Sequence, residues 1–198
     1  MKKSKYYDKI KPLLKRPFFT SKEANKKGIP SRMLIYFFEK GELEKIGRGI
    51  YKSVYYQSNI NFDLEDLVLT AISIKEGVIC LISALYYYDL TDQIMRQYWI
   101  AIPNKMRAPK RKHTKIIRMR NISLGHSNIK IGSLYVNIFD RERCIIDAFR
   151  YLEKEIALKA LKAYLNDKKN KPNLAKLNDY AMKLKTNIQS YILAFIHE

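Results

Sequence analysis

Polar and basic side chains recur at helical spacing in the segment SRMLIYFFEK. Arg32, Tyr36 and Lys40 fall on one side at intervals of four residues, and Ser31 precedes them at a position suited to a helix N-cap. Arginine is the commonest reader of guanine in the DNA major groove, and a recognition helix meets base edges near its N-terminus. Arg32 is therefore the first candidate for a base contact, and a solvated helix face is the alternative interpretation.

The residues before this helix predict two more helices that would position it. Residues 5–14 have apolar side chains at helical spacing, and Pro17 ends that pattern. The sequence TSKE at residues 20–23 is a capping box that starts a second helix, which Gly28 ends. Met33, Leu34, Phe37 and Phe38 are the expected apolar face of the third helix, which Gly41 closes. This order is typical of a helix-turn-helix.

A short hairpin is predicted after the third helix, with strands at residues 43–46 and 50–52. Gly47-Arg48-Gly49 joins them, so Arg48 would lie at the tip of a wing. A wing arginine contacts a phosphate or the minor groove, or it is simply part of a surface turn. Ser21 and Lys22 open the second helix, whose N-terminal amides are expected to contact a phosphate.

A second basic segment, PNKMRAPKRKHTKIIRMR, occupies residues 103–120 and contains no acidic residue. We interpret it as a loop leading into a strand and as a surface for DNA or an acidic protein, with a solvated loop as the alternative. Its basic residues are Lys105, Arg107, Lys110, Arg111, Lys112, Lys115, Arg118 and Arg120.

The composition agrees with a globular protein that binds a polyanion. The chain has 198 residues, 47% of them hydrophobic, and a formal net charge of +19. The charge is divided almost equally, with +10 in residues 1–57 and +9 in residues 58–198. No signal peptide or membrane span is predicted, so we expect a cytoplasmic protein.

The predicted fold class is α+β. A winged helix-turn-helix occupies residues 1–57, and a C-terminal domain of helices and a small sheet occupies residues 58–198. That domain would have an α/β core at 62–151 and a helical tail at 155–197, broken at residues 170–172. The core contains helices at 62–74, 79–88 and 142–151, the last capped by Asp140. Its strands lie at 97–102, 115–119, 129–133 and 134–139, and Trp99 is expected in the core.

No catalytic constellation is found in the sequence, and we predict no metal and no cofactor. His113, His126 and His197 lack metal-ligand spacing, and Cys80 and Cys144 stand in apolar contexts that indicate buried reduced thiols. The run DRER at residues 140–143 is explained by a helix cap and helical ion pairs.

Four stretches together resemble a known family: FFTSKEANKKGIPSRMLIYFFEKGELEKIGRGIYK, VICLISALYYYDLTDQ, YWIAIP and VNIFDRERCIIDAFRY. The first resembles the N-terminal winged helix of the AbiEi antitoxins, which belong to bacterial AbiE toxin–antitoxin and phage abortive-infection systems. The others resemble the helix that opens the second domain of that family, the strand after it, and a later strand and helix. Cys144 stands where the family has threonine, a departure that concerns packing.

The resemblance implies a transcriptional autorepressor that binds inverted repeats in its own promoter. It also implies an antitoxin whose C-terminal domain neutralises a nucleotidyltransferase-like toxin, in a type IV arrangement that needs no stable complex. The recognition-helix positions and Arg48 carry over as DNA-contact candidates. We expect a monomer in solution, with two copies on repeated sites through a dimer or through cooperative loading.

Two other functions stay open. A winged-helix regulator that senses a small ligand, with no toxin partner, would be favoured by a deep apolar pocket in residues 60–150. A nucleic-acid-modifying enzyme would need clustered carboxylates beside the basic segment, where Asp89 and Asp92 are the nearest in sequence.

Overall fold

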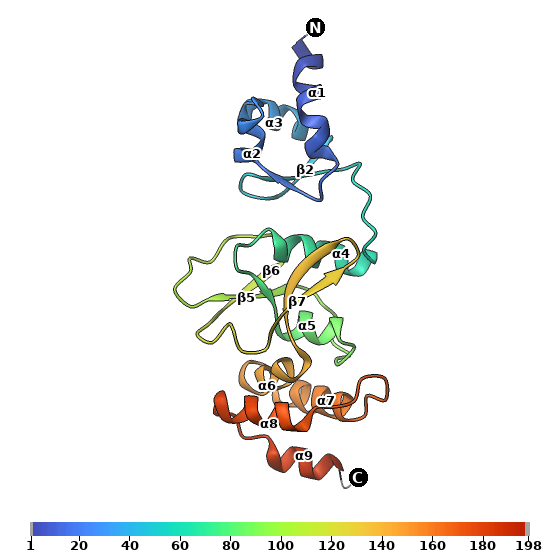
Figure 1. Ribbon diagram of the computed structural model, residues 1–198, viewed down its shortest axis with the longest axis vertical. Helices are drawn as coiled ribbons and strands as arrows, with labels where there is room; N and C mark the ends of the chain where they lie inside the picture. Colours follow the sequence, from blue (N-terminus) through green and yellow to red (C-terminus); the bar gives the residue numbers. More distant parts are fainter. Residues whose placement is uncertain (1, 197–198) are drawn as a thin grey trace. The chain divides into compact units, whose positions relative to one another are not determined.

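The computed structural model describes residues 2–196 and has the predicted α+β class. The chain divides into two compact units. Figure 1 shows the helices and strands coloured by their order in the sequence. Unit 1 comprises the chain up to Lys75 together with Pro109–Lys112 and Lys130–Leu134, and unit 2 comprises Glu76–Ala108, His113–Ile129 and the chain from Tyr135. The domain boundary between residues 57 and 58 stays a prediction.

Unit 1 contains the predicted winged helix-turn-helix. Its helices are α1 (Lys2–Leu14), α2 (Ser21–Lys26) and α3 (Ser31–Glu39). Strands β2 (Leu43–Gly47) and β3 (Ile50–Ser53) form the wing, and β3 also pairs antiparallel with β1 (Phe19–Thr20). Apolar side chains from every helix and from the sheet form one buried cluster: Ile10, Leu13, Phe19, Ala24, Ile29, Leu34, Phe37, Leu43 and Tyr51.

The capping box at the start of α2 is confirmed. The Glu23 amide donates to Thr20 Oγ1 at 3.2 Å, and the Thr20 amide donates to Glu23 Oε2 at 2.7 Å. Partial burial raises the pKa of Glu23, but the hydrogen bonds from Thr20 and the charge of Arg16 outweigh it and lower that pKa below its usual value. Gly28 follows with φ of +73°, the left-handed conformation expected of a glycine after a helix.

The predicted N-cap of α3 is wrong. Pro30, not Ser31, is the N-cap, with φ of −64° and ψ of 150°, and Ser31 is the first helical residue. The Pro30 carbonyl accepts a hydrogen bond from the Met33 amide at 2.8 Å, so the extended proline supplies the first acceptor of the helix. No side chain caps this end.

Unit 1 also contains α4 (Phe62–Ile72), which buries Leu67, Val68 and Ala71. Lys52 Nζ, on β3, lies 3.2 Å from Glu65 Oε1 on α4, and both side chains are largely buried. This ion pair joins the wing to the helix that follows it.

Unit 2 is built on a five-stranded sheet in the order β6-β5-β4-β8-β7. These strands are β4 (Val78–Ile79), β5 (Tyr98–Pro103), β6 (Thr114–Met119), β7 (His126–Ile131) and β8 (Leu134–Phe139). β5 runs antiparallel to β4 and parallel to β6. The strands at residues 97–102, 115–119 and 134–139 are confirmed, and the hairpin partner of β8 begins earlier than predicted.

The helices of unit 2 are α5 (Leu81–Tyr87), α6 (Arg141–Tyr151), α7 (Lys154–Leu165), α8 (Leu174–Lys183) and α9 (Gln189–Ile196). The helix predicted from residue 79 is wrong at its start, because Ile79 pairs with Ile100 of β5 and Ile138 of β8. Asp140 caps α6, and the predicted break in the tail separates α7 from α8. Residue 197, the predicted end of the tail, lies outside the described residues.

Buried polar groups fix α6 within unit 2. Arg143 Nε donates to Asp147 Oδ2 at 2.7 Å, and both side chains are 1% exposed. Arg143 Nη1 also donates to the carbonyls of Asn121 and Leu124. The helix cap predicted for the DRER run at residues 140–143 is confirmed. The ion pair of Arg143 is formed with Asp147, which lies outside that run.

Candidate nucleic-acid interface

The exposed face of α3 carries the first candidate residues. Arg32 and Lys40 are exposed, as predicted, and so are Ser31 and Glu39. Leu34 and Phe37 form the buried stripe, with Met33 partly buried beside it. Phe38 was predicted to face the core, and that is wrong, since 45% of it is exposed. Each residue turns a helix by about 100°, so Phe38 lies at the edge of a stripe centred between Leu34 and Phe37.

Tyr36 is less available than the helical spacing suggested. It is half-buried and packs against the core of unit 1, with its ring 5.8 Å from that of Phe37 in an edge-on arrangement. Lys40 Nζ lies 5.9 Å from the centre of the Tyr36 ring. The predicted polar face of α3 therefore narrows to Arg32, with Ser31 and Lys40 at its sides.

Ile35, which was not predicted as a site residue, is 51% exposed on α3 and lies between Arg32 and Glu39 in the sequence. An apolar side chain on the outer face of a recognition helix can contact the methyl group of thymine. The sequence held the signal for this exposure, because helical spacing places Ile35 off the buried stripe and next to Arg32 on the outer face.

The start of α2 differs from the prediction. The Ser21 amide donates to the Gly49 carbonyl at 2.8 Å, and the Glu23 amide donates to Thr20. Two of the amides expected to meet a phosphate are therefore already bonded within unit 1. The Lys22 side chain is exposed, and the Ser21 side chain is partly buried against the wing.

The wing presents Arg48 as predicted. Arg48 is exposed in the turn between β2 and β3, and Gly49 follows it with φ of +70°. A Cβ on Gly49 would lie 2.8 Å from Ser21 Oγ, so the wing turn is packed closely against the start of α2. This packing brings Ser21, Lys22 and Arg48 to one side of unit 1.

The basic segment divides between the two units. Lys110, Arg111 and Lys112 belong to unit 1. Arg111 donates from Nε to Ser73 Oγ and from Nη2 to the Ser73 carbonyl, both at 3.0 Å, and it pairs with Gly47 of the wing. Burial lowers the pKa of Arg111. Arg111 is thus an anchor for the segment, while Lys110 and Lys112 are exposed.

The other residues of the basic segment belong to unit 2. Lys105, Arg107 and Arg120 are exposed, and Arg118 Nε donates to the Met106 carbonyl at 3.3 Å. Lys115 places its Nζ 3.9 Å from the centre of the Trp99 ring. Trp99 was predicted in the core, and that is wrong, because it is only half-buried and lines a surface pocket.

Cys80 and Cys144 are free and buried, as predicted, and burial raises the pKa of each thiol well above its usual value. Among the described residues no cluster of three or more histidine, cysteine or acidic side chains is placed to hold a metal; His197 lies outside them. No helix in the described part of the chain is long and apolar enough to cross a membrane.

Comparison with known proteins identifies the segment that carries the α3 face and the wing. Residues 8–53 match a family model described as "Transcriptional regulator, AbiEi antitoxin". The match runs from α1 to the end of β3 and confirms the resemblance seen in the sequence. The matched family is one of transcriptional regulators. A search of curated proteins finds no match to this chain.

Proposed function

Given the family match over residues 8–53, we propose that this protein is an autorepressor and antitoxin of a type IV toxin–antitoxin operon. In this proposal unit 1 binds inverted repeats in the promoter of its own gene, as a double-stranded DNA reader in the cytoplasm. The remainder of the chain counteracts a nucleotidyltransferase-like toxin in phage defence by abortive infection, without forming a stable complex with it.

The observation that carries the DNA half is the outer face of α3 inside the matched segment. Arg32 is exposed near the helix N-terminus, where it would donate to guanine in a major groove. Ile35 on the same face would contact a thymine methyl group. Arg48 at the wing would bind the backbone or the minor groove.

Phosphate contacts would supply much of the affinity. The residues proposed for this task are Ser21, Lys22, Ser31, Tyr36 and Lys40 in the helices, and Lys110 and Lys112 in the basic segment. If about six phosphates are neutralised, log K falls against log salt with a slope of roughly −5. One module covers a single half-site, so repression requires two copies on the repeats, by cooperative loading of monomers or by a dimer.

The decisive experiment is a gel shift on the DNA directly upstream of the gene, with scrambled competitor, at two salt concentrations. We expect a discrete complex that survives the competitor and a second band as the protein concentration rises. Arg32→Ala should weaken operator binding by about 1–3 kcal/mol and relax the sequence preference. The matched control is Lys168→Gln, which removes one exposed charge from the loop after α7 and should leave the complex unchanged.

Removal of every band by the scrambled competitor would contradict the repressor half of the proposal. In that case the net charge of +19 would bind DNA without sequence preference. The antitoxin half needs a separate assay, in which cells expressing the neighbouring toxin-like gene grow only when this protein is supplied. Rescue by the Arg32→Ala variant would show that neutralisation does not depend on operator binding.

A ligand-sensing regulator is the second candidate. Its ligand would bind in the pocket that Trp99 lines, which is open and mixed in polarity rather than deep and apolar as expected for this candidate. The absence of a toxin-like gene beside this one, together with a ligand that alters operator affinity, would favour this candidate over the antitoxin.

A further inference from the structure

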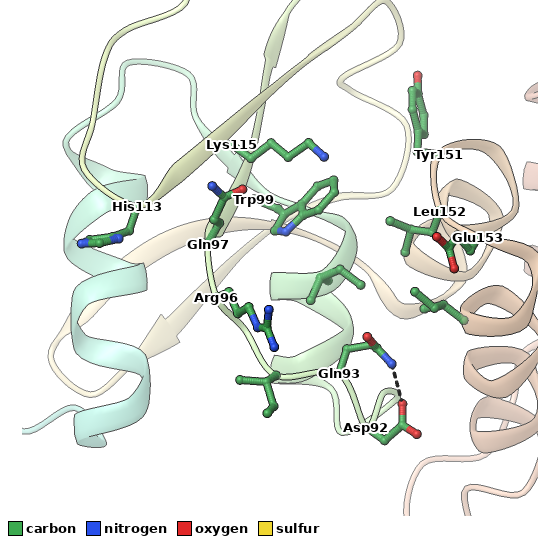
Figure 2. A pocket seen from close by; sticks show the side chains of 13 residues that line it. Asp92, Gln93, Arg96, Gln97, Trp99, His113, Lys115, Tyr151, Leu152 and Glu153 are labelled. Carbon is green, nitrogen blue, oxygen red and sulfur yellow. Dashed lines mark hydrogen bonds between the residues drawn. The ribbon is translucent and has the colours of Figure 1, made fainter.

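An open pocket of about 950 Å³ lies in unit 2, at the edge of the sheet beside the junction of α6 and α7. Trp99 and Lys115 form one wall, and Tyr151, Leu152 and Glu153 come from the opposite side (Figure 2). All the residues that line it belong to unit 2. The pocket therefore lies within one compact unit, and none of its residues belongs to the α3 face in unit 1.

Hydrogen bonds and strand pairing hold the backbone of Trp99 in place. The Trp99 amide donates to Ser83 Oγ at 2.9 Å, and the fully buried Ser83 hydroxyl donates in turn to the Gln97 carbonyl at 3.5 Å. Trp99 and Lys115 are direct partners in the pairing of β5 with β6. The ring is half-buried, so one part packs on the protein and the rest faces the pocket.

Two cations, Lys115 and Arg96, line the pocket beside Trp99. Lys115 Nζ lies 3.9 Å from the ring centre, and Arg96 lines the same pocket, whereas the side chain of His113 points away from Trp99 (Figure 2). His113 has φ of +47°, a left-handed conformation that histidine adopts more often than most other non-glycine residues. Its carbonyl accepts from the Tyr98 amide at 2.7 Å, which fixes the histidine at the start of β6.

Acidic groups in the pocket offset these cations only in part. Asp92 accepts a hydrogen bond from Gln93 and forms an ion pair with Lys159 at 3.3 Å, so its charge already has a partner. Glu153 lies at the α6–α7 junction, across the pocket from Trp99 (Figure 2). The wall around Trp99 therefore combines an aromatic plane with an excess of donors for an anion.

We propose that this pocket binds a nucleotide, with its base stacked on Trp99 and its phosphate held by Lys115 and Arg96. A flat aromatic group bearing an anion satisfies both features of the wall, and the volume lies within the range of small-molecule sites. Stacking of a base on an aromatic ring contributes more than the exposed contact of Lys115 with that ring. The base thus displaces the lysine, whose flexible side chain then binds the phosphate. The site does not depend on the proposed repressor function.

Trp99 is the single tryptophan of the chain, so its fluorescence reports on this pocket directly. We would titrate the full-length protein with AMP, GMP, CMP and UMP, and with ribose 5-phosphate as a ligand that lacks the base. We expect saturable quenching by one or more of the nucleotides and none by ribose phosphate. Lys115→Gln should weaken binding about tenfold, as expected for loss of a charge-assisted contact. Lys168→Gln is the matched control and should bind as the wild type does.

A second measurement keeps the proposal testable without the fluorophore. Calorimetric titration of Trp99→Ala should show affinity reduced by about tenfold or more, because a stacked base is lost. Trp99→Phe should retain most of the affinity, and it serves if the alanine variant does not fold. Equal binding by Trp99→Ala and the wild type would overturn the proposal, as would ribose phosphate binding as tightly as a nucleotide.

The nucleotide bound in the pocket could be a free nucleotide or the terminal nucleotide of a single strand. Titration with short single-stranded oligonucleotides separates these sources. Quenching by mononucleotides at matching affinity identifies the free ligand, whereas quenching by oligonucleotides alone, reduced in Lys115→Gln, identifies a strand end. Either result supports the site. Oligonucleotide binding that is unchanged in Lys115→Gln, with no effect of mononucleotides, would overturn it.

Discussion

Replacing Asp147 with asparagine tests how unit 2 is held together. Asp147 accepts from Arg143 Nε through Oδ2 and from Arg150 Nη1 through Oδ1, both at 2.7 Å. An asparagine side chain offers one oxygen and one NH₂ group, so it accepts from one arginine and turns a donor toward the other. The substitution therefore removes the charge of a buried acceptor and also misplaces a donor.

The expected cost follows from the partners that Arg143 keeps. Breaking a buried ion pair by removing one partner costs about 3–5 kcal/mol. Arg143 retains the carbonyls of Asn121 and Leu124, so we expect the lower end, about 3 kcal/mol in the free energy of unfolding. For a chain of this size that corresponds to a fall in Tm of about 6–12 °C.

Trp99 belongs to the same unit as Asp147, so urea unfolding followed by tryptophan fluorescence reports on the correct part of the chain. Arg150→Gln is the control, since Arg150 is 29% exposed and its loss should cost less than about 1 kcal/mol. The double variant Arg143→Met with Asp147→Leu removes both charges together but leaves the carbonyls of Asn121 and Leu124 without this donor. It should therefore recover only part of the lost stability. A loss below 1 kcal/mol in Asp147→Asn, or a double variant as unstable as the single one, would refute this account.

Three further predictions concern stability and thiol chemistry. Thr20→Ala should destabilise unit 1 by about 1 kcal/mol because it removes the cap of α2, and thermal unfolding followed by circular dichroism would measure this; no change in Tm would contradict it. Partial burial raises the pKa of Glu142, but hydrogen bonds from Tyr164 and Lys176 lower it overall, so its contribution to stability is present above the pKa of the unfolded state. That contribution should disappear as the pH falls through the lower folded-state value, and Glu142→Gln should flatten the pH dependence of urea unfolding in that range. Cys80 and Cys144, which burial keeps protonated, should react with a thiol reagent only after unfolding, so fast labelling of the native protein would argue against their burial.

Much of the fold could be predicted because its signals are local. The capping box at Thr20, the left-handed glycines at Gly28 and Gly49, and the cap at Asp140 each act within a few residues. The two-residue strands β1 and β4 could not be found in this way. Such short strands have no periodicity of their own, and their pairing with β3 and β5 is decided by residues distant in the chain.

The exposure of a candidate residue could be predicted where it follows from local sequence. It could not be predicted where the packing of the helix or sheet decides it. Arg32 and Arg48 lie exposed as predicted, whereas Phe38 and Ile35 are exposed because the buried stripe of α3 is narrow. Trp99 is a large aromatic residue of the kind expected in a core. Its strand, β5, lies next to the edge strand β6, and Trp99 therefore borders a pocket. Edge position depends on strand order, which no local pattern encodes.

The anchoring of Arg111 changes how the basic segment should be tested. Neutralising Lys110, Arg111 and Lys112 together would remove exposed charge and would also release the hydrogen bonds to Ser73. The two effects separate if Lys110→Gln is compared with Arg111→Gln. If the segment binds phosphate, Lys110→Gln should lower the salt slope of DNA binding by about 0.9, as for one lost phosphate contact. Arg111→Gln should instead reduce stability, and a slope that stays unchanged in Lys110→Gln while toxin neutralisation is lost would assign the segment to the toxin.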